Sequence, residues 1–173
     1  MGYRKISDYV VSVFGRSGAI TAQAADYAAF YAPIKPQCEW RADTHAGYGS
    51  TDTKIPYFTN VRVNVDTAEA ITVTNNSTNG CKVLINTADY YTFSFNMSPS
   101  SAAYAGISLN SSQLTTDISS INVQNRLALA YIEATNTGHV SIRLYCAKDD
   151  VVRPHAGVAV YTAAFSNFSV TRG

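Results

Sequence analysis

Most of this chain alternates between apolar and polar residues with a period of two. The clearest run is residues 90–97, in which every second side chain is large and apolar: Tyr91, Phe93, Phe95 and Met97. This period is that of a β-strand with one buried face. Comparable runs occupy 56–65 (Val61, Val63 and Val65 on one face), 69–74, 81–86, 103–109, 126–134, 139–147 and 157–170.

Clusters of Gly, Asn, Asp and Ser separate these runs at regular spacing. In the segment Asn75–Gly80, the pair Asn79-Gly80 suits a type I′ turn. About eight short antiparallel strands with such turn signals, and no long helical pattern, predict an all-β jelly-roll sandwich over residues 37–173.

Residues 1–36 have a different pattern and are predicted to be a separate extension. Gly15 and Gly18 suit a turn between two extended arms, and the alanine-rich stretch Ala22–Ala32 predicts a short helix that ends before Pro33. An isolated hairpin is marginally stable in water. We therefore expect it to order against a neighbouring subunit or a larger assembly; the alternative is a hairpin packed on its own domain.

One strand is apolar on both faces, and this predicts self-association. The six residues are Leu127, Ala128, Leu129, Ala130, Tyr131 and Ile132. One face can enter the core, and the other needs a cover. A subunit interface of a homotrimer supplies that cover, with the alanine side allowing close approach about the axis. The alternative is a central strand covered by the chain's own loops.

Composition excludes several function classes. Only 14% of residues are charged and the net charge is +1, so there is no electrostatic case for nucleic acid or an anionic membrane. No apolar run approaches the ~20 residues of a membrane helix, and the polar N-terminus is not a signal peptide, so we expect cytoplasmic synthesis and no membrane insertion. Cys38, Cys81 and Cys146 are predicted to be buried thiols; a Cys81–Cys146 bridge is the alternative.

The sequence carries no recognisable catalytic, cofactor or metal motif, and we predict a non-enzymatic protein. Its three histidines lack metal-ligand spacing, and both His139 and His155 are predicted to be exposed loop residues. Asp149-Asp150 suits a polar turn better than a calcium site. Trp40 suits a core position better than a sugar-stacking platform.

The N-terminal segment resembles a short module of bacteriophage tail-fibre and other appendage proteins. The likeness covers about fifteen residues of the form VFGRxGxxTAQxxDY. It runs through Val13, Phe14, Gly15, Arg16, Gly18, Thr21, Gln23, Asp26 and Tyr27, with Ala25 in place of the usual glycine. The resemblance implies that these residues attach the chain to a virion.

The head is similar to the globular heads of the complement and tumour-necrosis-factor superfamily. The likeness rests on Ile55–Val61, on Tyr90–Phe95 with Asp89 replacing a glycine, and on Phe165–Val170 with Asn167 replacing a glycine. It implies a compact jelly roll that forms trimers.

Together these features predict a non-enzymatic bacteriophage structural protein, a short trimeric fibre. Residues 1–36 would anchor it to other virion proteins, and the head 37–173 would project and adhere to a host-surface glycan or protein. The first alternative is a capsid head fibre or decoration protein without a receptor. The second is a monomeric carbohydrate-binding module.

Overall fold

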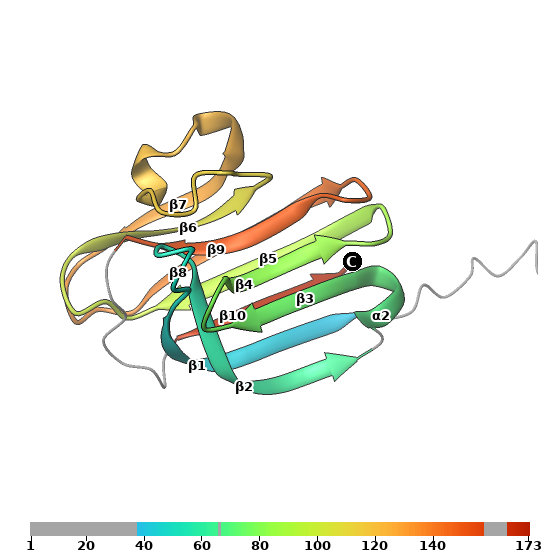
Figure 1. Ribbon diagram of the computed structural model, residues 1–173, viewed down its shortest axis with the longest axis horizontal. Coiled ribbons are helices and arrows are strands. Elements are labelled where there is room, and N and C mark those ends of the chain that lie inside the picture. The colour runs from blue at the N-terminus through green and yellow to red at the C-terminus, as the bar shows by residue number, and fades with distance from the viewer. Residues whose placement is uncertain (1–37, 66, 158–165) are drawn as a thin grey trace, which may run out of the picture. The chain divides into compact units, whose positions relative to one another are not determined.

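The computed structural model describes residues 38–65, 67–157 and 166–173 (Figure 1). The chain divides into two compact units, residues 1–36 and 37–173. All described residues belong to the second unit. The predicted N-terminal hairpin, helix and attachment residues lie outside them.

The described part is built from ten strands and three short helical turns. The strands are β1 (Glu39–Tyr48), β2 (Pro56–Val65), β3 (Ile71–Asn76), β4 (Gly80–Ile85), β5 (Asp89–Met97), β6 (Ala103–Leu109), β7 (Arg126–Ile132), β8 (Gly138–Cys146), β9 (Val151–Ala156) and β10 (Asn167–Arg172). The helical turns are α2 (Thr67–Ala70), η2 (Ile118–Ser120) and η3 (Val123–Asn125).

The strands form two five-stranded antiparallel sheets. The first sheet has the order β2-β1-β10-β5-β8, and the second has the order β3-β4-β9-β6-β7. Figure 1 shows the connection between β6 and β7, with its two helical turns, standing at one end of this arrangement. The non-sequential neighbours and the two sheets confirm the predicted jelly-roll sandwich, with ten described strands in place of about eight.

The core lies between the sheets and is almost wholly apolar. The four predicted inward residues of β5 (Tyr91, Phe93, Phe95 and Met97) are each 0% exposed. Phe168 of β10 packs edge-on against Phe95, with ring centroids 6.4 Å apart. Each such side chain stabilises the fold by about 1.5–3 kcal/mol through burial.

The alternation of apolar and polar residues does not predict two of the strands, β1 and β9. In β1 the alternation is broken by register shifts and by Thr44, whose φ is 65°. In β9, Pro154 argues against a central strand, yet β4 pairs with β9 only through Val151 and Val152. The proline therefore lies beyond the pairing with β4, although it still pairs with Ile107 of β6 on the other side.

The predicted strand 157–170 is right at residues 167–170, which belong to β10, and wrong at its start; residues 158–165 lie outside the described part. Gly157 forms a bend after β9, and β10 begins only at Asn167. The hairpin at Asn75–Gly80 is present, but the turn is not type I′. A type I′ turn needs positive φ at both central residues, and of this pair only Gly80 has one, at 71°.

Candidate functional site

The edge strand β7 exposes one apolar face, as predicted, but not the face expected to approach a trimer axis. Ala128 and Ala130 pack against the core and Ile132 is buried. Leu129 and Tyr131 point the other way and are 39% and 59% exposed. The alanine side is therefore inside the sandwich, and the outward surface is Leu129 and Tyr131. Because β7 is at the sheet edge, the alternative of a central strand is also wrong.

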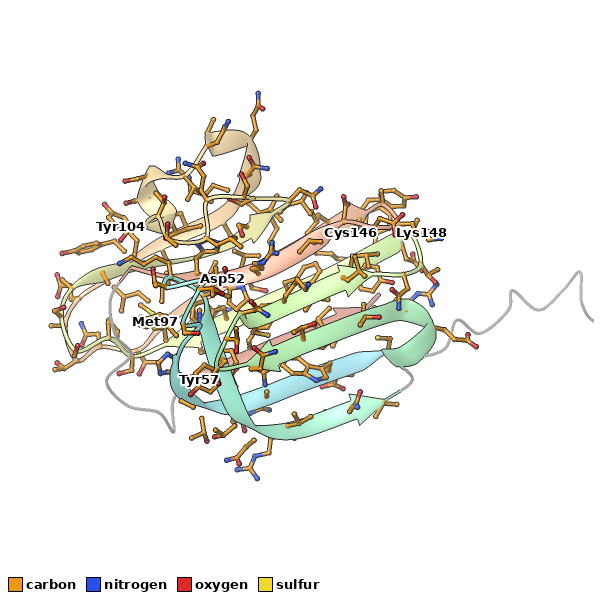
Figure 2. The ribbon with its side chains drawn as sticks, viewed as in Figure 1. Asp52, Tyr57, Met97, Tyr104, Cys146 and Lys148 are labelled. Carbon is orange, nitrogen blue, oxygen red and sulfur yellow. The ribbon has the colours of Figure 1, made fainter. Side chains whose placement is uncertain are left out.

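Tyr104 of β6 extends this surface. It lies opposite Tyr131 in the ladder, and the two rings meet edge to face with centroids 5.2 Å apart. Figure 2 shows Tyr104 at the end of the sandwich away from Cys146 and Lys148. We call Tyr104, Leu129 and Tyr131 the edge patch.

A second aromatic patch lies on the outer face of the first sheet. Tyr90 of β5 and Tyr145 of β8 are directly paired across the ladder, with ring centroids 5.5 Å apart and exposures of 51% and 57%. The Arg143 guanidinium carbon lies 5.6 Å from the centre of the Tyr90 ring. Tyr90 and Arg143 also line an open hollow of about 350 Å³. We call Tyr90, Arg143 and Tyr145 the face patch.

Sequence reasoning missed the face patch because it placed Tyr90 with the polar residues of its strand. A signal was nonetheless present, since two tyrosines occupy outward positions of runs that are otherwise polar outside. Beyond the patch the same sheet face is hydrophilic. Ser94 Oγ lies 2.9 Å from Ser141 Oγ, and Asn96 donates from Nδ2 to Asn167 Oδ1 at 2.9 Å.

The outer face of the second sheet contains a buried polar cluster: Ser108, Arg153 and His155. Ser108 lies opposite Arg153 in the β6–β9 ladder, and His155 lies opposite Gly106. Ser108 and His155 are both 0% exposed. Within the described residues, Ser108 Oγ and both ring nitrogens of His155 have no hydrogen-bond partner.

His155 was expected in an exposed loop, and this is wrong. It belongs to β9 and is covered, because Pro154 does not end that strand. His139 is exposed as expected, although it lies in β8 rather than in a turn; its Nδ1 is 2.8 Å from Asn96 Oδ1.

Burial governs the titration of His155 in the second sheet and of His45 in the first sheet. Loss of hydration lowers the pKa of His155 to about 4, and the nearby Arg153 lowers it further while Asp117 opposes the change. Burial alone lowers the pKa of His45 to about 4. The pKa of Arg153 is also lowered by burial, with Asp52 opposing. Both histidines are therefore neutral at pH 7.

The cluster does not form a catalytic triad. A serine nucleophile needs a hydrogen bond to its base and access to substrate, whereas Ser108 Oγ lacks the bond and is fully covered. Within the described ranges no three His, Cys, Asp or Glu side chains are grouped to hold a metal ion.

The remaining sequence candidates occupy structural positions. Trp40 is 4% exposed and packs edge-on against Phe168 at 6.3 Å, so it is a core residue. Cys38, Cys81 and Cys146 are buried and form no disulfide within the described residues. Asp149-Asp150 forms the turn before β9, where the Asp150 carboxylate accepts from the Ala147 backbone N–H at 2.8 Å. No helix in the described ranges is long and apolar enough to span a membrane.

Comparison with known proteins supports the fold. No protein-family model and no curated protein matches the chain. Murine APRIL, a solved jelly-roll protein of the tumour-necrosis-factor family, superposes with a TM-score of 0.54 at 6% identity, over 79% of this chain and 99% of that chain. Pika GITRL gives a TM-score of 0.49 at 7% identity, over 80% of this chain and 96% of that chain. The likeness to murine APRIL shows the fold alone, and it agrees with the jelly-roll sandwich of the described domain.

Proposed function

We propose that this chain is a non-enzymatic structural protein of a bacteriophage virion: a short trimeric fibre whose jelly-roll head contributes to adhesion at the host surface. The carrying observation is the combination of a phage appendage-like segment at residues 13–27 with a head of the tumour-necrosis-factor type. The segment supplies attachment to other virion proteins, and the head supplies a projecting, compact surface.

The two aromatic patches support self-association of the head. Exposed aromatic clusters are enriched at protein interfaces, because tyrosine buries a large area while keeping its hydroxyl solvated. The edge patch is on β6 and β7, whereas the face patch is on the other sheet, on β5 and β8. Two different surfaces that meet head to tail form a closed ring when the rotation between copies closes.

We infer that the edge patch of one copy packs on the face patch of the next. Tyr131 and Leu129 would lie against Tyr90 and Tyr145, and Arg143 would face the edge strand of the neighbour. In a trimer this contact is repeated three times, so every patch is covered. Adhesion would then use surfaces outside the patches, and three heads held together would raise a weak affinity by roughly 10²–10⁴ through multivalency.

Light scattering on the purified full chain tests the assembly. We expect a mass three times the 18.7 kDa of one chain. Tyr131→Ser should shift the mass toward the monomer, since it removes the most exposed side chain of the edge patch. The matched control is Val61→Ser on β2, which is 53% exposed at the opposite edge of the sandwich and should stay trimeric. A monomeric wild-type chain would contradict the proposal.

Immunogold labelling of purified virions with antibody against the head tests the location. We expect label at the tail or baseplate, and a chain lacking residues 1–35 should be missing from particles. Label over the capsid would favour a head fibre or decoration protein without a receptor. Full incorporation of the truncated chain would contradict the anchoring role of residues 13–27.

A monomeric carbohydrate-binding module is the second candidate, and the face patch favours it. Exposed tyrosines beside an arginine and a row of hydroxyl and amide groups are side chains that bind sugars. A glycan array separates the two: a module binds as a monomer and loses binding on Tyr90→Ala, whereas the same change in a fibre head lowers the mass.

A further inference from the structure

The connection between β6 and β7 covers part of the second sheet, and we call residues 110–125 the strap. Its residue Ile118 is 0% exposed and sits over Gly106, where an added Cβ would collide with the Ile118 side chain. Asp117 Oδ1 accepts from the backbone N–H of Ser119 at 2.9 Å and so caps the short turn η2. The strap is thus a folded cover that rests on β6.

The strap and the neighbouring loop together enclose His155. Arg153 of β9 donates from Nη1 to the carbonyl of Ser111 in the strap, at 3.4 Å. In the loop before β2, the Lys54 backbone N–H donates to the Leu114 carbonyl at 3.1 Å, and its carbonyl accepts from Ala156 at 3.0 Å. These bonds join the strap, the loop and β9 around one buried imidazole.

The charged groups that face His155 come from the strap, from the loop before β2 and from β9. Together they do not favour a positive charge on His155 in addition to that of Arg153. Arg153 lies two residues away on the same face of β9. Lys54 Nζ is 2.6 Å from the Gly157 carbonyl at the end of that strand. Asp117 of the strap opposes the lowering of the His155 pKa, and Asp52 opposes the lowering of the Arg153 pKa. The pKa of Tyr48 in β1 is raised by burial and by Asp117. None of these groups is hydrogen-bonded to the ring.

We propose that the strap is an acid-sensitive cover of the second sheet: protonation of His155 places an unpaired charge beside Arg153, and the strap lifts from β6 and β9 to hydrate it. The proposal does not depend on the virion assignment or on trimer formation. It assigns to the strap a local opening that leaves the core between the sheets intact.

The direction of the effect follows from proton linkage. The closed strap favours neutral His155, whose pKa is lowered to about 4, whereas an open strap returns it to an ordinary value near 6.5. Closure is therefore fully supported above about pH 6.5 and is progressively lost as the pH falls toward 4. One proton taken up per opening raises the open population by up to about tenfold per pH unit.

Hydrogen exchange on the full chain measures this opening. Amide protection of residues 110–125 is compared between pH 7.0 and 5.0 after correction for the intrinsic exchange rate, and Trp40 fluorescence reports on the core. We expect the strap to exchange roughly twentyfold faster at pH 5.0, with Trp40 emission unchanged. Equal protection at both pH values would overturn the proposal, as would loss of strap and core signals together.

Substitution of each histidine identifies the sensor. His155→Gln should remove the pH dependence of strap exchange, while His139→Gln (the exposed histidine) and His45→Gln should retain it. If His155→Gln does not fold, the wild-type chain with labelled histidine provides the test by NMR. The His155 ring should then titrate over the pH range in which the strap opens; titration elsewhere, or a persisting response in His155→Gln, would overturn the assignment.

Discussion

The space between the two sheets and the space beneath the strap are equally buried but chemically opposite. The first is filled by side chains such as Phe93, Phe95 and Phe168, none of which can ionise. The second holds Ser108, Arg153 and His155, with polar atoms that lack partners among the described residues. Burial stabilises the first at every pH. In the second space, burial stabilises the fold only while the His155 imidazole is neutral. The contact between the strap and the second sheet therefore depends on pH.

The largest effect should come from truncation in the apolar space. Phe95 is 0% exposed and meets Phe58 and Phe168 with ring centroids 6.4 Å away in each case. Phe95→Ala should lower the free energy of unfolding by about 3–5 kcal/mol, through lost burial and the cavity left behind. Urea denaturation at pH 7 measures it, and Ser94→Ala, one residue along on the outer face, should cost about 1 kcal/mol or less. A loss below about 1 kcal/mol for Phe95→Ala would place β5 outside the core.

The second effect should come from acid and should be specific to the buried histidines. The pKa of His45 is lowered to about 4 by burial, so folding favours its neutral form, and its contribution is lost as the pH falls from 6.5 toward 4. At pH 5 this amounts to about 2 kcal/mol relative to pH 7. Urea denaturation at the two pH values should show a correspondingly smaller difference for His45→Gln than for the wild-type chain. An unchanged difference would mean that His45 is hydrated in the folded state.

The sequence predicted the residues between the sheets but not those beneath the strap, and the reason is the chemistry of each space. The side chains that fill the apolar space alternate along the sequence: Tyr91, Phe93, Phe95 and Met97. This period predicted both the strand and its inward face. No comparable sequence pattern predicts the polar residues beneath the strap. Strand β9 contains Pro154, and the cover that buries His155 comes from a segment some forty residues earlier in the chain (110–125).

The aromatic patches lie between these extremes. Because β7 is apolar on both faces, the sequence predicted that one apolar face would remain outside the core. The period of two could not tell which face that would be. The register settles it, because Ala130 pairs with Ala105 and Tyr131 with Tyr104. Ala128 and Ala130 then lie on the inside of the edge strand, and Leu129 and Tyr131 on the outside. Pairing between distant strands, which a single sequence does not record, decided the outcome.

A third prediction tests the seating of the strap on the second sheet. A Cβ at Gly106 would collide with the Ile118 side chain and with the backbone carbonyl of Ala128. Gly106→Ala should therefore lower the free energy of unfolding by about 1–3 kcal/mol through overpacking, and it should speed exchange in residues 110–125 more than in β5. The control is Ser108→Ala on the same face of β6, which removes an unpartnered hydroxyl and should be neutral or slightly stabilising. Stability unchanged by Gly106→Ala would mean that the strap does not rest there.

The smallest effect should come from ion pairs whose arginine partners are exposed, with an Asp43 side chain that is itself 16% exposed, and it shows why full burial is needed for the acid response. Asp43 accepts from Arg41 Nε at 3.0 Å and from Arg62 Nε at 3.1 Å, and the two arginine side chains are 46% and 60% exposed. Exposed pairs of this kind contribute about 0–1 kcal/mol and are screened by salt. Asp43→Ala should therefore change the urea midpoint only slightly, and less at high salt. Its difference in stability between pH 7 and pH 5 should match that of the wild-type chain, because solvated charges need no strap to lift. If Asp43→Ala reduced the difference in stability between pH 7 and pH 5 as His45→Gln is expected to do, that difference would belong to surface charge rather than to the buried imidazole of His45.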